Sequence, residues 1–124
     1  MPMSKGPMMT AFRILLSLMF AVMAAYTAIV VSREGWGLVP VFIGDIAGLT
    51  WRGQFNLDFA TYLILSALWV CWRGGFTPLA LALGAAASVL GIMFLAPYLL
   101  VALQRSGGDI RLWLLGVQAQ RRAD

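Results

Sequence analysis

The stretch that most constrains the fold runs from Trp51 to Arg73 and carries a Trp-Arg pair at each end. Between the two pairs the residues are apolar, apart from a few polar side chains near the start. Trp51 and Trp72 are 21 positions apart, which on a helix spans about 31 Å, close to the thickness of a bilayer's hydrocarbon core. Tryptophan prefers the lipid–water boundary, and arginine reaches past it to the headgroups. The stretch is therefore predicted to cross a membrane with an anchor at each end.

Helical periodicity gives this span a polar face. At about 100° per residue, seven polar side chains fall within a sector of about 140°: Gln54, Asp58, Thr61, Tyr62, Ser66, Trp69 and Arg73. Lipid cannot satisfy a carboxylate, an amide or a hydroxyl. We therefore expect this polar stripe to face protein and the opposite side of the helix to face lipid.

The composition extends this interpretation to the whole chain. Charged residues make up 11% of the 124 positions, against about 25% in soluble domains, and 61% are apolar. The pattern predicts an all-α fold, a single domain over residues 1–124 that is an integral membrane bundle of three transmembrane helices at about 13–32, 54–72 and 78–104. The net charge of +4 is spread over the segments between these spans, which indicates attraction to a membrane surface and argues against nucleic acid as a partner.

The first span has an alternative, because basic residues followed by an apolar run also begin a secretory signal peptide. Ala21–Ala25 would then be the cleavage zone, but the uncharged run of 19 residues exceeds the usual ~7–15, which favours an uncleaved span. One side of this helix carries a stripe of small side chains, which would let a neighbouring backbone come close. Alternatively, these alanines have no role in packing. The stripe comprises Ser17, Ala21, Ala24, Ala25, Ala28 and Ser32.

The third span is predicted as one helix that begins with Thr77 as N-cap and Pro78 as first residue. From 78 to 104 it would measure roughly 40 Å, longer than the bilayer core, so it must tilt or bend. Pro97 would supply the bend, since it leaves the carbonyl of Met93 without a donor. A second face of small residues predicts close helix packing: Ala80, Gly84, Ala87, Ser88 and Gly91.

Two further segments lie outside these spans. The glycine-rich segment 33–52 contains an apolar piece, Leu38–Leu49, that is too short for a normal span of about 20 residues. It is expected to form an interfacial or re-entrant loop after the first helix, with a packed surface loop as the alternative. Residues 109–120 have the pattern of a short C-terminal amphipathic helix, lying either on the membrane or against the ends of the bundle.

The orientation depends on whether residues 36–49 cross. With three spans, the Lys and Arg count puts the C-terminus in the cytoplasm and the N-terminus outside. A fourth, short crossing would put both termini in the cytoplasm, with seven basic residues on the cytoplasmic side and two outside. Three spans are preferred, because the fourth crossing would bury Asp45 in lipid.

Five polar residues are candidates for a structural or functional role: Asp58, Arg33, Arg52, Asp45 and Tyr62. Asp58 has two interpretations, a first-turn carboxylate in a helix capped by Asn56, or an ion-paired or proton-handling group inside the membrane boundary. Arg52 points about 120° away from Asp58 on a straight helix, so Arg33 is the expected partner. Such a pair would tie the first two spans together.

The usual carriers of catalysis are missing from the sequence. There is no histidine, and Cys71 is the single cysteine, so neither a zinc ligand set nor a histidine-activated nucleophile can be assembled. The paired glycines around Trp36 lack the spacing of a phosphate-binding loop. We therefore expect no catalytic residues, no metal and no cofactor, and a protein that is not an enzyme.

Three segments together suggest a relationship: GWGLVPVFIGDIAGLTWRGQFNLDF, LSALWVCWR, and FLAPYLL ahead of a Gly-Asp pair. Over residues 13–116 the chain resembles a family of small bacterial multi-span membrane proteins with no assigned function. The resemblance implies a multi-pass location in the bacterial inner membrane. It transfers no catalytic or binding residues.

These observations favour a small non-enzymatic integral membrane protein, an accessory, assembly or regulatory subunit that packs against a membrane partner. The alternative is an oligomeric conduit or transporter for a small solute or protons, which the polar stripe would line. The expected partners are the lipid bilayer and either another membrane protein or further copies of the chain. The surroundings of the polar stripe distinguish these two functions. A stripe covered within one chain would argue against a conduit, and an exposed stripe would indicate a partner or an oligomer.

Overall fold

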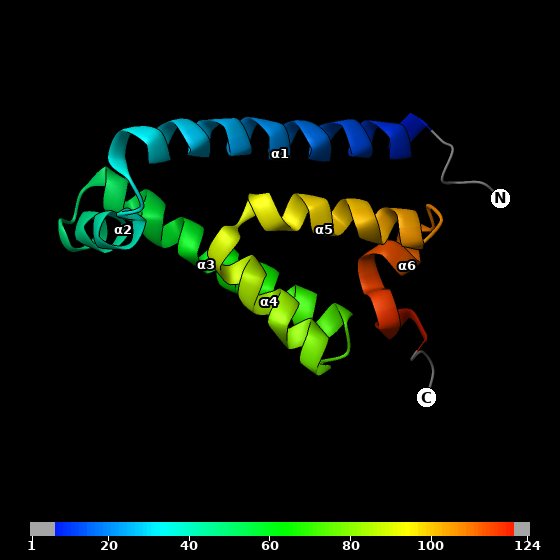
Figure 1. Ribbon diagram of the computed structural model, residues 1–124. Coiled ribbons are helices and arrows are strands. Elements are labelled where there is room, and N and C mark those ends of the chain that lie inside the picture. Colours follow the sequence, from blue (N-terminus) through cyan, green and yellow to red (C-terminus); the bar gives the residue numbers. More distant parts are fainter. Residues whose placement is uncertain (1–6, 121–124) are drawn as a thin grey trace.

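The computed structural model describes residues 7–120, and every regular element in that range is a helix (Figure 1). The all-α prediction is confirmed for this part of the chain. The elements are α1 (Pro7–Glu34), α2 (Leu38–Ala47), α3 (Trp51–Arg73), α4 (Pro78–Leu90), α5 (Ile92–Arg105), α6 (Ile110–Leu115) and the 3-10 helix η2 (Gly116–Gln120).

The helices pack as two pairs, α1 with α5 and α3 with α4, and α4 and α5 form the two arms of a V. Figure 1 shows α1 alongside α5 and the α3–α4 hairpin running obliquely to them, while α2 packs on the start of α3. α4 and α5 meet at Gly91 and diverge from there, because α4 stays on α3 and α5 follows α1. The segment formed by α6 and η2 lies at the open end of the V, where α6 contacts α5 and η2 contacts α3.

Small side chains bring α3 and α4 close together. Ala80, Gly84 and Ala87 of α4 are buried, and a Cβ on Gly84 would overlap the Cys71 sulfur and lie 3.0 Å from the Ala67 carbonyl oxygen. At the start of α4, the Thr77 hydroxyl accepts a hydrogen bond from the Ala80 amide at 3.2 Å, as an N-cap does. The predicted cap and the predicted packing role of the α4 small-residue face are both confirmed.

The single helix predicted over 78–104 is wrong, because the chain breaks at Gly91. This residue has φ 62° and ψ −136°, a conformation that is essentially restricted to glycine. Leu90 therefore ends α4, and a new helix begins at Ile92. Pro97, which was expected to bend the helix, lies inside α5 without ending it.

The buried core lies between α1, α5 and α6. It contains Met9, Leu16, Ala96, Ala102, Leu103 and Trp113. The Trp113 indole donates to the Leu99 carbonyl at 3.0 Å, and its ring meets Phe12 edge-on with centroids 5.2 Å apart. The C-terminal segment thus packs against the end of the bundle, one of its two predicted positions. Of the four apolar residues expected on one side of this helix (Ile110, Trp113, Leu114 and Val117), the first two pack in the core and the last two are exposed.

Two helices, α1 and α3, are long and apolar enough to cross a membrane. In each, only 6% of the most apolar 18-residue window is buried, whereas the core helix of a soluble protein would be mostly covered. The other apolar helices are shorter, between 10 and 17 residues. Most of the α1 small-residue stripe, including Ser17, Ala21, Ala25 and Ala28, is exposed, so within this chain it is not a packing face.

The segment after α1 was expected to be an interfacial or re-entrant loop, and it contains a helix instead. α2 has ten residues, and at 1.5 Å per residue it is about 15 Å long, half the depth of a bilayer core. None of its residues is buried, and Leu38, Val39, Val41 and Ile43 are exposed. α2 is therefore too short to form the fourth crossing that was considered from the sequence.

Gly91→Ala tests whether the chain needs glycine at the break between α4 and α5. A side chain at this φ is strained, and its Cβ would also lie 3.2 Å from the Phe59 ring, so we expect a loss of about 1–3 kcal/mol in stability. Gly44→Ala is the matched control, because a Cβ there meets open space inside a helix and should stabilise by about 0.5–1 kcal/mol. Thermal unfolding in detergent, followed by circular dichroism, measures both. A stabilised Gly91→Ala variant would mean that α4 and α5 form one continuous helix.

Candidate functional site

The corner between α2 and α3 brings together two of the five predicted residues. One carboxylate oxygen of Asp45 lies 3.4 Å from the Arg52 Nε, and the other accepts from the Asn56 side-chain amide at 3.5 Å. The same amide group donates to the Phe42 carbonyl at 3.3 Å. The Asp45 side chain is 22% exposed and that of Arg52 is 80% exposed. Asp45 is thus a paired carboxylate at a helix corner.

Gly53 makes this corner possible. A Cβ on Gly53 would overlap the Asp45 carbonyl oxygen and lie 2.9 Å from the Ile46 Cα, so only glycine lets the end of α2 reach the first turn of α3. The N-cap of α3 is Thr50, whose hydroxyl accepts from the Gly53 amide at 3.4 Å. The predicted cap, Asn56, lies inside the helix, so Asp58 belongs to its third turn and not to its first.

The predicted pairing of Asp58 with Arg33 is wrong. Both residues are exposed, and no ion pair joins their side chains within residues 7–120. The reason is topological, because α1 packs on α5 and leaves α3 to α2 and α4. Asp58 forms a hydrogen bond through its backbone, where its carbonyl accepts from the Thr61 hydroxyl at 2.6 Å.

The polar stripe of α3 is divided into two halves. In the N-terminal half, Gln54, Asp58, Thr61 and Tyr62 are exposed, and Tyr62 reaches 67%. In the C-terminal half, Ser66, Trp69 and Arg73 are half-buried. The Trp69 indole donates to the Leu114 carbonyl at 3.1 Å, so this half faces the C-terminal segment. The prediction that the stripe faces protein holds for its C-terminal half alone.

Arg73 holds the C-terminal segment against α3. Its Nε donates to the Trp113 carbonyl at 2.7 Å and its Nη2 to the Leu112 carbonyl at 3.3 Å. These carbonyls lie in the last turn of α6, where a helix is electronegative and favours a cation. The Gln118 side chain donates in return to the Trp72 carbonyl at 2.9 Å. Arg73, predicted as a headgroup anchor, therefore binds protein carbonyls.

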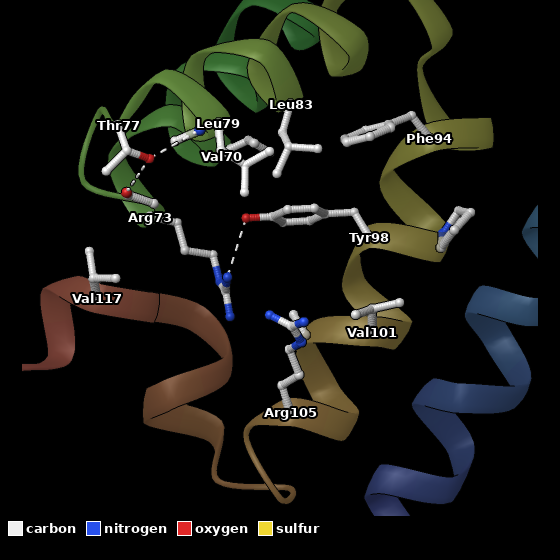
Figure 2. A pocket seen from close by; sticks show the side chains of 14 residues that line it. Val70, Arg73, Thr77, Leu79, Leu83, Phe94, Tyr98, Val101, Arg105 and Val117 are labelled. Atoms are coloured by element: carbon white, nitrogen blue, oxygen red, sulfur yellow. Dashed lines mark hydrogen bonds between the residues drawn. The ribbon is translucent and has the colours of Figure 1, made fainter.

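A cleft of about 600 Å³ opens between the arms of the V (Figure 2). The Arg73 Nη1 donates to the Tyr98 hydroxyl at 3.2 Å, and the guanidinium lies 5.5 Å from the centre of the Tyr98 ring. Arg105, from the end of α5, lines the same cleft, and Figure 2 shows both guanidinium groups at the end where α6 lies. Tyr98 and Arg105 were not among the residues predicted from the sequence, since no local pattern connects them with Arg73.

The described residues offer no metal centre. Within residues 7–120, no three His, Cys, Asp or Glu side chains lie close enough to share a metal ion. No model of a protein family, no curated protein and no solved structure matches this chain. The resemblance to small bacterial membrane proteins therefore stays a prediction.

A double-mutant cycle tests the α2–α3 corner. Asp45→Asn and Arg52→Gln should each destabilise, and the double variant should recover about 0.2–1 kcal/mol, a small value because Arg52 is largely exposed. The matched control is the cycle of Asp58→Asn with Arg33→Gln, for which we expect additive effects. Unfolding in detergent provides the free energies. A coupled control pair, or an additive Asp45–Arg52 pair, would contradict this assignment.

Proposed function

We propose that this chain is a non-enzymatic, multi-pass protein of the bacterial inner membrane that serves as an accessory, assembly or regulatory subunit of a membrane partner. One observation carries the proposal: the N-terminal half of the α3 polar stripe is exposed on a helix long and apolar enough to cross a membrane. Asp58, seven positions beyond Trp51, lies about 10 Å along that helix. A carboxylate at this depth needs protein or water, which lipid does not supply.

The exposed small-residue stripe of α1 supports the same proposal. Small side chains at intervals of about one turn let a second helix approach closely. Within the described chain this stripe has no helix packed on it, while the corresponding face of α4 is buried against α3. α1 also contributes Met9 and Leu16 to the buried core, so its removal as a signal peptide would uncover that core.

For the topology we propose two crossings, α1 and α3, with α4 and α5 as a re-entrant pair. The apex of that pair, Gly91, lies against Phe59 and Leu63, near the middle of α3. Gly91 is buried, which is the condition for a break in a helix at membrane depth. The ends of α4 and α5 return to the same end of the molecule, where α6 and η2 connect them (Figure 1).

Charge supports this topology. Among the described arginines, Arg13, Arg73, Arg105 and Arg111 belong to the end where α6 lies, and Arg33 and Arg52 to the opposite end (Figure 1). Basic residues concentrate on the cytoplasmic side of a membrane. Both ends of the described chain would then face the cytoplasm. Lys5, Arg121 and Arg122, which entered the count made from the sequence, lie outside the described residues.

Single cysteines distinguish two crossings from three. On a Cys71→Ser background in intact cells, Gly37→Cys should react with a membrane-impermeant maleimide, while Phe76→Cys and Ser106→Cys should react only after the cells are opened. In a three-span protein, Phe76 and Ser106 would lie on opposite sides. Opposite labelling of these two positions would therefore contradict the re-entrant pair.

Affinity purification in a mild detergent, followed by mass spectrometry, tests the partner. We expect a stoichiometric membrane protein in the eluate, reduced about tenfold or more by Asp58→Asn, because losing one member of a buried polar contact costs about 2–5 kcal/mol. Glu34→Gln is the matched control, since it removes an equally exposed carboxylate from the end of α1. A monodisperse chain without a partner would contradict the proposal. A pure homo-oligomer that dissociates with Asp58→Asn would favour the alternative, an oligomeric conduit.

A further inference from the structure

The cleft between α4 and α5 has the two-part lining of a site for an amphiphile. Its volume of about 600 Å³ lies within the range of about 300–1,000 Å³ that small-molecule sites occupy. Toward the apex the walls are apolar, with Leu83 and Phe94, while Val70, Leu79 and Val101 lie nearer the polar groups. At the open end lie the cationic and hydroxyl groups of Arg73, Arg105 and Tyr98 (Figure 2).

The open end of the cleft carries more positive than negative side chains. Within residues 7–120, no Asp or Glu lines the cleft, although two arginines do. The acidic side chain nearest in sequence to Arg105 is Asp109, whose carboxylate accepts from the amides of Arg111 and Leu112 as the N-cap of α6. Arg105 is exposed and has no hydrogen bond or ion pair with any residue of the range 7–120. The site is therefore complementary to an anion.

Donors remain available for that anion. A guanidinium has five N–H groups, and Arg73 uses three of them, on Leu112, Trp113 and Tyr98, which leaves two. The Tyr98 hydroxyl accepts from Arg73, so its own hydrogen is free within the described chain. Thr77, by contrast, is occupied as a cap, donating to Gly74 and accepting from Ala80. Guanidinium forks suit the oxygens of a phosphate.

We infer that this cleft binds an anionic phospholipid, with the phosphate between Arg105 and the Arg73–Tyr98 pair and one acyl chain between α4 and α5. The inference rests on the membrane location in the proposed function but not on the partner. Arg73 ends α3 beside Trp72, at the depth expected for headgroups, and the apolar walls continue from there toward Gly91. The two parts of the cleft thus follow the polarity of a lipid leaflet.

The orientation of Arg73 makes the site specific. Because α6 fixes the guanidinium through two carbonyls, its remaining N–H groups are held in place without a bound ligand. A zwitterionic lipid brings an ammonium group next to these two guanidiniums, and the repulsion lowers its affinity. We therefore expect phosphatidylglycerol to bind in preference to phosphatidylcholine.

The test is native mass spectrometry of the purified, delipidated full chain in detergent, titrated with phosphatidylglycerol or with phosphatidylcholine. We expect one molecule of phosphatidylglycerol to bind at least tenfold more tightly than phosphatidylcholine. Arg105→Gln should weaken phosphatidylglycerol about tenfold and Tyr98→Phe about fivefold, in line with the loss of a charged and a neutral hydrogen bond. Arg105→Gln should unfold at the temperature of the parent protein, because Arg105 has no hydrogen bond or ion pair with residues 7–120, whereas Tyr98→Phe also loses its hydrogen bond to Arg73.

Arg33→Gln is the matched control, since it removes an exposed arginine at the other end of the molecule. Equal binding of the two lipids, or an equal loss in Arg33→Gln and Arg105→Gln, would overturn the inference and indicate general attraction to a basic protein. Complete displacement of the lipid by millimolar inorganic phosphate would also overturn it, in favour of a soluble phosphate ligand. Flotation with pure phosphatidylcholine vesicles reports membrane association separately, so failure of the location and failure of the site are distinguishable.

Discussion

The positive φ at Gly91 determines how the rest of the molecule is arranged. At this residue the chain leaves the direction of α4, so the two halves of one apolar segment pack on different partners. A straight helix from 78 to 104 could not reach both α3 and α1 in this way. The same turn opens the cleft, because two helices that meet at one point must separate along their length. A backbone conformation available mainly to glycine thus sets both the packing and the one cavity described here.

The two arms of the V are connected at their far ends by the C-terminal segment. In this segment α6 contacts α5 and η2 contacts α3, and these contacts are directional. Trp113 enters the core beside α1 and α5, while Arg73 and Trp69 of α3 donate to the last carbonyls of α6. The carbonyl groups at the end of a helix need partners that the helix does not supply. Arg73 meets this need at the electronegative end of α6, and its Nη1 donates to Tyr98 in the lining of the cleft.

Local patterns predicted those parts of the fold that depend on neighbours in sequence. Periodicity located α1 and α3, and Thr77-Pro78 marked the start of α4. The break at Gly91 was missed because a glycine inside a helical pattern costs only about 1 kcal/mol, and the same residue fits a small-residue packing face. The partner of Asp58 was missed for a different reason. Which helices pack together is decided by the break and by the α2 corner, and neither is visible in the periodicity of α3.

The distribution of charge follows from this arrangement. Asp45 is compensated by Arg52 at the α2–α3 corner, Asp109 by the first amides of α6, and Arg73 by the last carbonyls of the same helix. In residues 7–120, four charged side chains are left without such compensation: Arg33, Glu34, Asp58 and Arg105. The first two end α1, whereas Asp58 and Arg105 lie on different helices and toward opposite ends of the molecule. In the proposed membrane location, where an ionised group in contact with lipid is costly, we expect Asp58 and Arg105 each to need a partner from outside residues 7–120. Because Asp58 lies on an exposed helix face and Arg105 lines a cleft, we propose a protein surface as the partner of the first and a small anionic ligand as the partner of the second.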